Sequence, residues 1–295
     1  MQIKNSKIVL KEKINHQDSV DISNLQNICL EKDKITLKLE IDYKLSINDK
    51  EKDVLDHINE FLYYDDNRLV GYIGICDFGG DAIEVNGMVH PKYRRRRIFT
   101  KLFSLVKNEW ENRKPKRILL LSDSKSITGL GFISSLGAKH VHSEYEMFYN
   151  SHSRAFELSN NICFRKAADK DLKEISRQNS IYFDSEYDED STSISDEERM
   201  DGMNTYMAEI DNKIIGKVRL ETISNFGGIY GLGVLPEYRG RGYGRDILTW
   251  SVKKLKETDS KEIVLQVSVS NENALNLYKS TGFEIKSKMD YFELT

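Results

Sequence analysis

The sequence predicts a mixed α/β protein made of two tandem copies of one fold. Three observations lead to this prediction: the chain resembles itself at a shift of 145 residues, its second copy alternates strand-like with helix-like segments, and a basic glycine-rich turn joins one of these strands to a helix. The length of 295 residues also favours two domains, each able to bury an adequate core.

The internal repeat is clearest where residues 66–71 (DNRLVG) align with residues 211–216 (DNKIIG). The same shift continues without a net gap as far as Gly137, which aligns with Gly282, and it places Val89, Pro91, Tyr93, Arg94 and Arg96 on Val234, Pro236, Tyr238, Arg239 and Arg241. A unit of 145 residues is the size of a domain and too long for a solenoid repeat. We therefore expect domains at residues 1–155 and 156–295, divided within the polar stretch 150–161.

The second copy can be divided into elements in order. Asp169 is the expected N-cap of the first helix, and Asp211-Asn212 the expected hairpin turn between two strands. The helix after the glycine-rich turn carries apolar residues at helical spacing. The expected strands are 162–166, 206–210, 213–221, a segment ending at Val234, 262–269 and 289–294, and the expected helices begin near 169, 244 and 274.

The glycine-rich turn, RGRGYG at residues 239–244, has the features of a pyrophosphate-binding site. Glycines let the backbone approach a ligand closely, the arginines supply positive charge, and a helix starting near Gly244 adds its positive dipole end. The turn is not a P-loop, because Arg245-Asp246 stands where Lys-Ser/Thr is required. It is not a Rossmann fingerprint, since the third glycine comes one residue too early.

The turn and the sequence after it resemble the GNAT superfamily of acetyl-CoA-dependent N-acetyltransferases. Arg239, Gly242 and Gly244 fit the family pattern Arg/Gln-x-x-Gly-x-Gly, and a later strand is followed by Asn271, by a helix carrying Tyr278, and by Gly-Phe. The resemblance implies that each domain is a mixed, mostly antiparallel twisted sheet flanked by helices. It also implies acetyl-CoA as the acyl donor and no metal.

The resemblance further implies which residues serve the reaction. The backbone of the strand around residues 232–234 would hold the pantetheine arm and the thioester carbonyl, and Tyr278 would lie near the sulfur as a hydrogen-bond donor or general acid. The alternative for Tyr278 is a packing role alone. Glu221 and Tyr230 are candidates for the general base, with a water relay as the alternative. The full cofactor-binding set is Leu232, Gly233, Val234, Arg239, Gly240, Arg241, Gly242, Tyr243, Gly244, Asn271, Asn273 and Tyr278.

The first copy differs where the chemistry belongs. Residues 94–99 read RRRRIF, so all three glycines are lost, and a Cβ at each position hinders close approach of a phosphate and disfavours positive φ. Ile133 stands in place of Tyr278, and Ser126 and Thr128 in place of the two asparagines. We therefore expect the second copy to bind acetyl-CoA and the first to have lost this ability, with a residual anion site as an open alternative.

Composition excludes several functional classes. With 39% hydrophobic and 31% charged residues and a net charge of −3, no general polyanion-binding role is indicated, and we expect no nucleic-acid partner. Cys29, Cys76 and Cys163 lack a CxxC spacing, and His140 and His142 lack a third ligand, so no disulfide or zinc framework is implied. There is no apolar signal core and no membrane-length apolar run, so we expect a cytoplasmic protein. Because the fusion of two copies can mimic a dimer within one chain, we expect a monomer.

The acidic segment 184–198 holds eight carboxylates and no basic residue. It either attracts a cationic amine or basic peptide, or is a solvated loop. Together these observations predict an N-acetyltransferase that moves an acetyl group to a primary amine of a small molecule or peptide by direct attack on the thioester, with its active site in the C-terminal domain. Two alternatives stay open: a protein N-terminus or lysine as acceptor, and a non-catalytic acyl-CoA sensor or scaffold.

Overall fold

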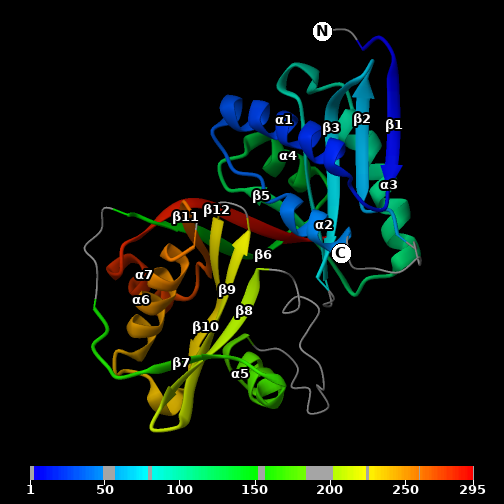
Figure 1. Ribbon diagram of the computed structural model, residues 1–295. Coiled ribbons are helices and arrows are strands. Elements are labelled where there is room, and N and C mark those ends of the chain that lie inside the picture. Colours follow the sequence, from blue (N-terminus) through cyan, green and yellow to red (C-terminus); the bar gives the residue numbers. More distant parts are fainter. Residues whose placement is uncertain are drawn as a thin grey trace. The chain divides into compact units, whose positions relative to one another are not determined.

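The computed structural model describes residues 3–48, 57–78, 82–151, 157–183, 202–223, 226–258 and 260–294 (Figure 1). The chain divides into two compact units: unit 1 comprises Met1–Ser143 and Ser287–Thr295, and unit 2 comprises Glu144–Lys286. The expected division at residues 155 and 156 keeps each copy contiguous, whereas these units also exchange their last segments. The acidic segment 184–198 lies outside the described residues.

The first helix of unit 1, which follows strand β1, has its start fixed by a capping box. The Asn15 side chain accepts a hydrogen bond from the Asp18 N–H, and the Asp18 carboxylate accepts one from the Asn15 N–H. The sheet order is β1-β2-β3-β4-β5 and then the end of β12. In chain order the elements are β1 (Ser6–Lys11), α1 (His16–Asp33), α2 (Ile41–Asn48), β2 (Glu60–Asp65), β3 (Arg68–Asp77), β4 (Ala82–Val89), a 3-10 turn (Pro91–Tyr93), α3 (Ile98–Arg113), β5 (Arg117–Asp123), α4 (Ile127–Ser135) and β6 (Lys139–Tyr149).

The sheet of unit 1 is covered on both faces because successive strand residues point to opposite sides. Leu62 and Tyr72 pack with residues of α1 in one core, whereas their chain neighbours Tyr63 and Ile73 pack with residues of α3 in another. Figure 1 shows the two helices on opposite faces of these strands.

Among the described residues, unit 2 repeats the order of the strands and of the helices α1, α3 and α4, and a 3-10 turn precedes its first helix. Its sheet order is β7-β8-β9-β10-β11 and then the end of β6. The elements are β7 (Cys163–Lys166), a 3-10 turn (Asp169–Asp171), α5 (Leu172–Phe183), β8 (Met203–Ile210), β9 (Lys213–Ile223), β10 (Phe226–Val234), a 3-10 turn (Pro236–Tyr238), α6 (Tyr243–Lys256), β11 (Glu262–Ser268), α7 (Glu272–Ser280) and β12 (Phe283–Glu293).

One local prediction is corrected by the start of α5. Asp169 was expected to cap this helix, but the carboxylate that accepts the Ala168 N–H, at 2.8 Å, belongs to Asp171. Arg165 holds the same carboxylate with two hydrogen bonds of 2.6 and 2.7 Å. Asp171 is the last residue of the 3-10 turn, and its carboxylate closes that turn onto its N-cap residue Ala168, whereas Asp169 lies inside the turn.

The last strands of the two copies are exchanged between the units. β6, which ends the first copy, pairs from Glu144 to Phe148 with β11 of unit 2. β12, which ends the second copy, pairs from Met289 to Glu293 with β5 of unit 1. Each sheet is therefore completed by a strand that begins in the other copy's sequence.

Candidate active site

The strands β10 and β11 separate halfway along their length. They pair in parallel only from Phe226 to Ile229 on β10, while the rest of β10 stays attached to β9 on its other side. A bulge between Tyr230 and Gly233 accompanies the separation, and Gly231 takes φ +54° inside it. The backbone of residues 232–234, which the sequence predicts to hold the pantetheine arm, thus lies where β10 has left its ladder with β11.

The glycine-rich turn leads from this strand into α6. Gly240 and Gly242 have φ values of +77° and +84°, and Gly242 is the N-cap of the helix without any side-chain capping bond. The first N–H groups of α6 are therefore free of a capping side chain, as an anion site requires. Arg239 donates from Nε to the Val234 carbonyl at 2.9 Å, and Arg241 donates to the Glu237 carbonyl at 3.3 Å.

Asp246 fixes the beginning of α6, a role that the sequence analysis missed. Its fully buried carboxylate accepts hydrogen bonds of 3.0 Å from the backbone N–H groups of Ser159 and Asn160, and one of 2.6 Å from the Asn160 side chain. A carboxylate in the first turn of a helix also opposes the helix dipole. The pattern of an acidic residue just after the last glycine was visible in the sequence, but its partners lie 86 and 87 residues away.

Tyr278 on α7 is 8% exposed, and no hydrogen bond of its hydroxyl is seen among the described residues. Burial raises its pKa to about 12, so the phenol is protonated at neutral pH. Asn271 is the N-cap of α7, its side-chain oxygen accepting the Ala274 N–H at 3.1 Å, and Asn273 is exposed in the first turn of the same helix.

The two candidates for the general base share one face of the sheet. Tyr230 lies opposite Arg219 in the ladder, and Glu221 follows two residues after Arg219 on the same face. The Arg219 guanidinium lies over the Tyr230 ring, 5.6 Å from its centroid. Two neighbouring glycines on β10 show which face of the sheet α6 covers. A Cβ on Gly227 would meet Leu255 of α6, whereas a Cβ on Gly228, which points to the opposite face, would meet the Tyr230 ring. Both candidates therefore lie on the face away from α6, where α5 packs.

Tyr182, at the end of α5, is a site residue that the sequence analysis did not identify. Its ring lies so close to Gly233 that any Cβ at this position would overlap it. The hydroxyl donates to Gln178 at 3.0 Å, and Gln178 in turn donates to Glu174 at 2.7 Å. Burial raises the pKa of Tyr182 above its ordinary value. The aromatic pair at 182–183, just before the acidic segment, is the signal that could have indicated it.

The corresponding turn of unit 1 corrects one argument from the sequence. Arginine was expected to disfavour positive φ there, yet Arg95 and Arg97 take φ values of +63° and +58°, close to those of Gly240 and Gly242. Arg94 repeats the bond made by Arg239, donating from Nε to the Val89 carbonyl at 3.0 Å. The strand, turn and helix on either side hold the backbone in this shape, so the difference between the copies lies in their side chains.

Two further findings concern the described residues. No group of three or more histidine, cysteine, aspartate and glutamate side chains among them could hold a metal ion. None of the helices in the described part of the chain is long and apolar enough to cross a membrane.

Unit 2 thus combines a mostly antiparallel sheet, one splayed parallel pair and a glycine turn at a helix N-terminus. Residues 170–283 match the model of the Acetyltransferase (GNAT) family, and this part of the chain is a GNAT acetyltransferase domain, as the resemblance predicted.

Individual relatives agree with this assignment. The chain is 34% identical over 101 residues to an N-alpha-acetyltransferase of Sulfurisphaera tokodaii, and the match covers 30% of this chain and 60% of that protein. A GCN5-related N-acetyltransferase from Sphaerobacter thermophilus has a similar structure, with a TM-score of 0.76 and 19% identity over 97% of this chain and 95% of that one. A tandem GNAT protein from the clavulanic acid biosynthesis pathway gives a TM-score of 0.70 at 13% identity, over 98% of each chain. The likeness to these two structures shows a shared mixed α/β fold.

Proposed function

We propose that unit 2 is an acetyl-CoA-dependent N-acetyltransferase that transfers an acetyl group to a primary amine of a small molecule or peptide. The observation that supports this most directly is the convergence of three features: the strand segment that leaves its ladder, the uncapped N-terminus of α6 behind a glycine turn, and the buried hydroxyl of Tyr278. Bound there, acetyl-CoA supplies the thioester whose acetyl group is transferred.

The residues present suit the parts of this donor. The N–H groups at the start of α6, together with Arg239 and Arg241, suit a pyrophosphate. The backbone of residues 232–234 suits the amides of a pantetheine arm, and its N–H groups suit the negative charge that develops on a thioester oxygen under attack. In the proposed reaction the neutral amine forms the new C–N bond directly, the C–S bond breaks, and the amine nitrogen loses a proton.

Tyr278 acts in this proposal as a hydrogen-bond donor toward the leaving sulfur. An alkyl thiol such as that of cysteine has a pKa of about 8.5, well below the pKa of about 12 that burial gives Tyr278. Because the phenol holds its proton more tightly than a thiol does, it stabilises a thiolate by donating a hydrogen bond and need not give the proton away. Of the two roles considered for Tyr278, we therefore propose hydrogen-bond donation and not general acid catalysis.

The proton lost by the amine has an acceptor on the α5 face. We propose that Glu221 or Tyr230 takes it, directly or through a water relay, because both lie on the face where α5 and Tyr182 border the bulge. Tyr278 has no tyrosine counterpart in unit 1, where Ile133 stands in the aligned position. We therefore propose that unit 2 alone performs catalysis.

The test compares acetyl transfer by the wild type, by Tyr278→Phe and by the control Tyr206→Phe. Tyr206 packs on Trp250 with ring centroids 4.9 Å apart, so its hydroxyl should not matter for turnover. We expect Tyr278→Phe to lower kcat by about 10- to 100-fold with little change in acetyl-CoA affinity, since one donor to developing charge is removed. An unchanged kcat would leave Tyr278 a packing residue.

Two other functions remain candidates. The name of the Sulfurisphaera relative favours a protein or peptide N-terminus as acceptor, with lysine as a related choice. A non-catalytic acyl-CoA sensor is the second, and it would bind acetyl-CoA without transfer to any amine. Parallel assays with peptides bearing free N-termini, peptides bearing lysine with a blocked N-terminus, and small polyamines distinguish the acceptors, while calorimetric binding without turnover would identify a sensor.

A further inference from the structure

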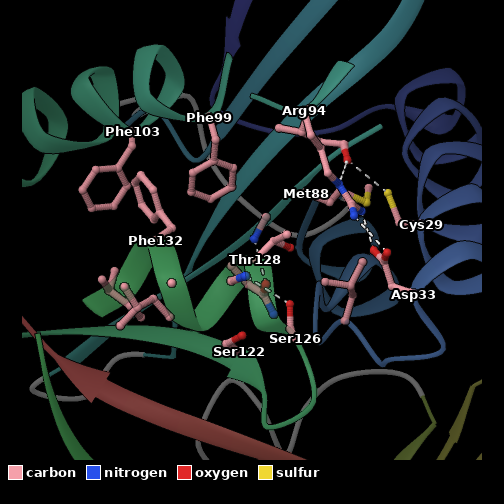
Figure 2. Close-up of a pocket in the computed structure, with 18 of the residues that line it drawn as sticks. Cys29, Asp33, Met88, Arg94, Phe99, Phe103, Ser122, Ser126, Thr128 and Phe132 are labelled. Atoms are coloured by element: carbon pink, nitrogen blue, oxygen red, sulfur yellow. Dashed lines mark hydrogen bonds and ion pairs between the residues drawn. The ribbon is translucent and has the colours of Figure 1, made fainter. Parts of the chain in front are cut away.

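A cavity of about 510 Å³ lies within unit 1, a size typical of small-molecule sites (Figure 2). Its walls are the end of β4, the turn at residues 94–97 (hereafter the arginine turn), the first turn of α3, the end of β5, α4, and the segment after α1. By the shift of 145 residues, most residues predicted to bind acetyl-CoA in unit 2 have counterparts in these walls, among them Val89, Arg94, Ser126 and Ile133. The cavity thus occupies the copy's cofactor position.

The shape of the cavity does not suit the donor of unit 2. Phe99 aligns with Gly244, where a Cβ would point toward Leu277 at 3.4 Å and Val234 at 3.8 Å, between the strand end and the last helix. The Phe99 ring packs edge-on against Phe132, the counterpart of Leu277, with centroids 4.7 Å apart. Phe132 also meets Phe103 at 5.2 Å, and Figure 2 shows the three rings together on one side of the cavity. Aromatic rings therefore fill the path that the pantetheine arm takes in our proposal for unit 2.

The inner part of the cavity offers mainly apolar surface, and its ionisable side chains are engaged by neighbouring groups. Arg94 forms an ion pair with Asp33, so the two charges compensate each other. Burial raises the pKa of the Cys29 thiol to about 11, so this thiol is uncharged at pH 7. The Asp123 carboxylate is occupied by hydrogen bonds from Thr36 and Lys125, which fix the segment after α1 against the end of β5. The remaining wall includes Ile35, Leu37, Met88, Leu120 and Ile133.

The arginine turn gives one edge of the cavity a positive charge. Arg95 and Arg97 both line the cavity and are exposed, and neither has an ion pair among the described residues. Arg97 is also the N-cap of the 16-residue helix α3 and makes no side-chain capping bond, so the first N–H groups of that helix remain available beside it. Two cations at a helix N-terminus favour an anionic group at this edge.

We propose that unit 1 binds an elongated apolar molecule carrying one anionic head group, a medium-chain carboxylate being the simplest example. The head group lies at Arg95, Arg97 and the N-terminus of α3, and the chain lies against the phenylalanine rings and the apolar inner wall. No transfer reaction accompanies binding. Unit 1 is in this view a ligand-binding domain whose specificity arose when phenylalanine and arginine replaced the glycines of the turn.

The test is calorimetric titration of decanoate into the full chain, with decanol as the probe that lacks the charge. We expect one decanoate site per chain, weaker binding of decanol, and no competition from saturating acetyl-CoA. The double variant Arg95→Ala/Arg97→Ala should weaken decanoate by about tenfold, because two charge-assisted contacts are lost. Arg96→Ala is the matched control, since Arg96 belongs to the same turn but does not line the cavity.

A second variant fills the cavity without touching the core. Thr128 is an exposed residue of α4 that lines the cavity, so Thr128→Trp should abolish decanoate binding while thermal unfolding stays close to that of the wild type. Absence of decanoate binding to the wild type, or equal binding by the double variant and Arg96→Ala, would overturn the proposal. Displacement of decanoate by acetyl-CoA in the wild type, together with loss of one acetyl-CoA site in Thr128→Trp, would also overturn the proposal and would make the cavity a second donor site.

Discussion

The two turns of this protein, RRRRIF in unit 1 and RGRGYG in unit 2, have nearly the same backbone and opposite chemical character. In both, the first arginine bonds back to the last carbonyl of the preceding strand, and the second and fourth residues are left-handed. Glycine is therefore not required here to form the turn. What glycine leaves in unit 2 is space beside the backbone, and what arginine and phenylalanine supply in unit 1 is charge and an aromatic wall.

The largest expected effect comes from placing the phenylalanine of unit 1 into unit 2. Gly244→Phe should reduce acetyl-CoA binding by at least about 100-fold, because the side chain would project between the end of β10 and α7, toward Val234 and Leu277. Calorimetric titration of acetyl-CoA measures the effect, and circular dichroism checks that the fold is kept. Unaltered affinity in a folded variant would mean that the donor follows another path.

A smaller effect, on stability, is expected for an ion pair that both units form near the start of their first helix. Near the start of each unit's first helix, an aspartate accepts a backbone N–H and pairs with a basic strand residue: Asp18 with Lys11 at 2.6 Å, and Asp171 with Arg165 at 2.6 Å. Asp171→Asn should destabilise the protein by about 1–2 kcal/mol at pH 7, because charge-assisted hydrogen bonds are weakened. Urea unfolding followed by fluorescence gives this value.

The same variant carries a prediction about pH. Arg165 lowers the pKa of Asp171 in the folded state, so the stability that this carboxylate contributes is present above its unfolded pKa of about 3.9 and is lost as pH falls through the folded value. The difference in unfolding free energy between wild type and Asp171→Asn should therefore shrink below about pH 4. A difference that stays constant down to pH 2 would show that the ion pair contributes nothing.

The smallest effects concern the turn conformation itself. Gly242→Ala places a Cβ at φ +84° with its nearest neighbour, the Asn160 side chain, 3.7 Å away, so the cost should be only that of the left-handed backbone, about 1 kcal/mol. The reciprocal Arg97→Gly should relieve the same strain in unit 1 and change stability by less than about 1 kcal/mol. Thermal unfolding of both variants tests this symmetry, and a loss of several kcal/mol at either site would contradict it.

The sequence was informative about elements whose signals are local. The hairpin turn at Asp211-Asn212 and the helix after the glycine turn appear where predicted, because turn residues and apolar spacing act over a few residues. It could not indicate that the ring of Tyr182 lies on Gly233, or that Asp246 holds residues 159 and 160, since these contacts join segments more than 50 residues apart. The φ values of Arg95 and Arg97 were missed because a residue's own preference was weighed without the strand and helix that constrain it.

The exchange of the final strands makes the duplication behave like a domain-swapped dimer contained in one polypeptide. A gene fragment cut at the middle of the sequence would yield an N-terminal piece whose β5 lacks the partner supplied by residues 289–293, and a C-terminal piece whose β11 lacks the partner supplied by residues 144–148. Each fragment would present a bare sheet edge, which invites aggregation. Either copy could stand alone only if its own last strand folded back into the place that the other's now holds, and this dependence gives a physical reason for a copy without a counterpart of Tyr278 to persist beside one that has it.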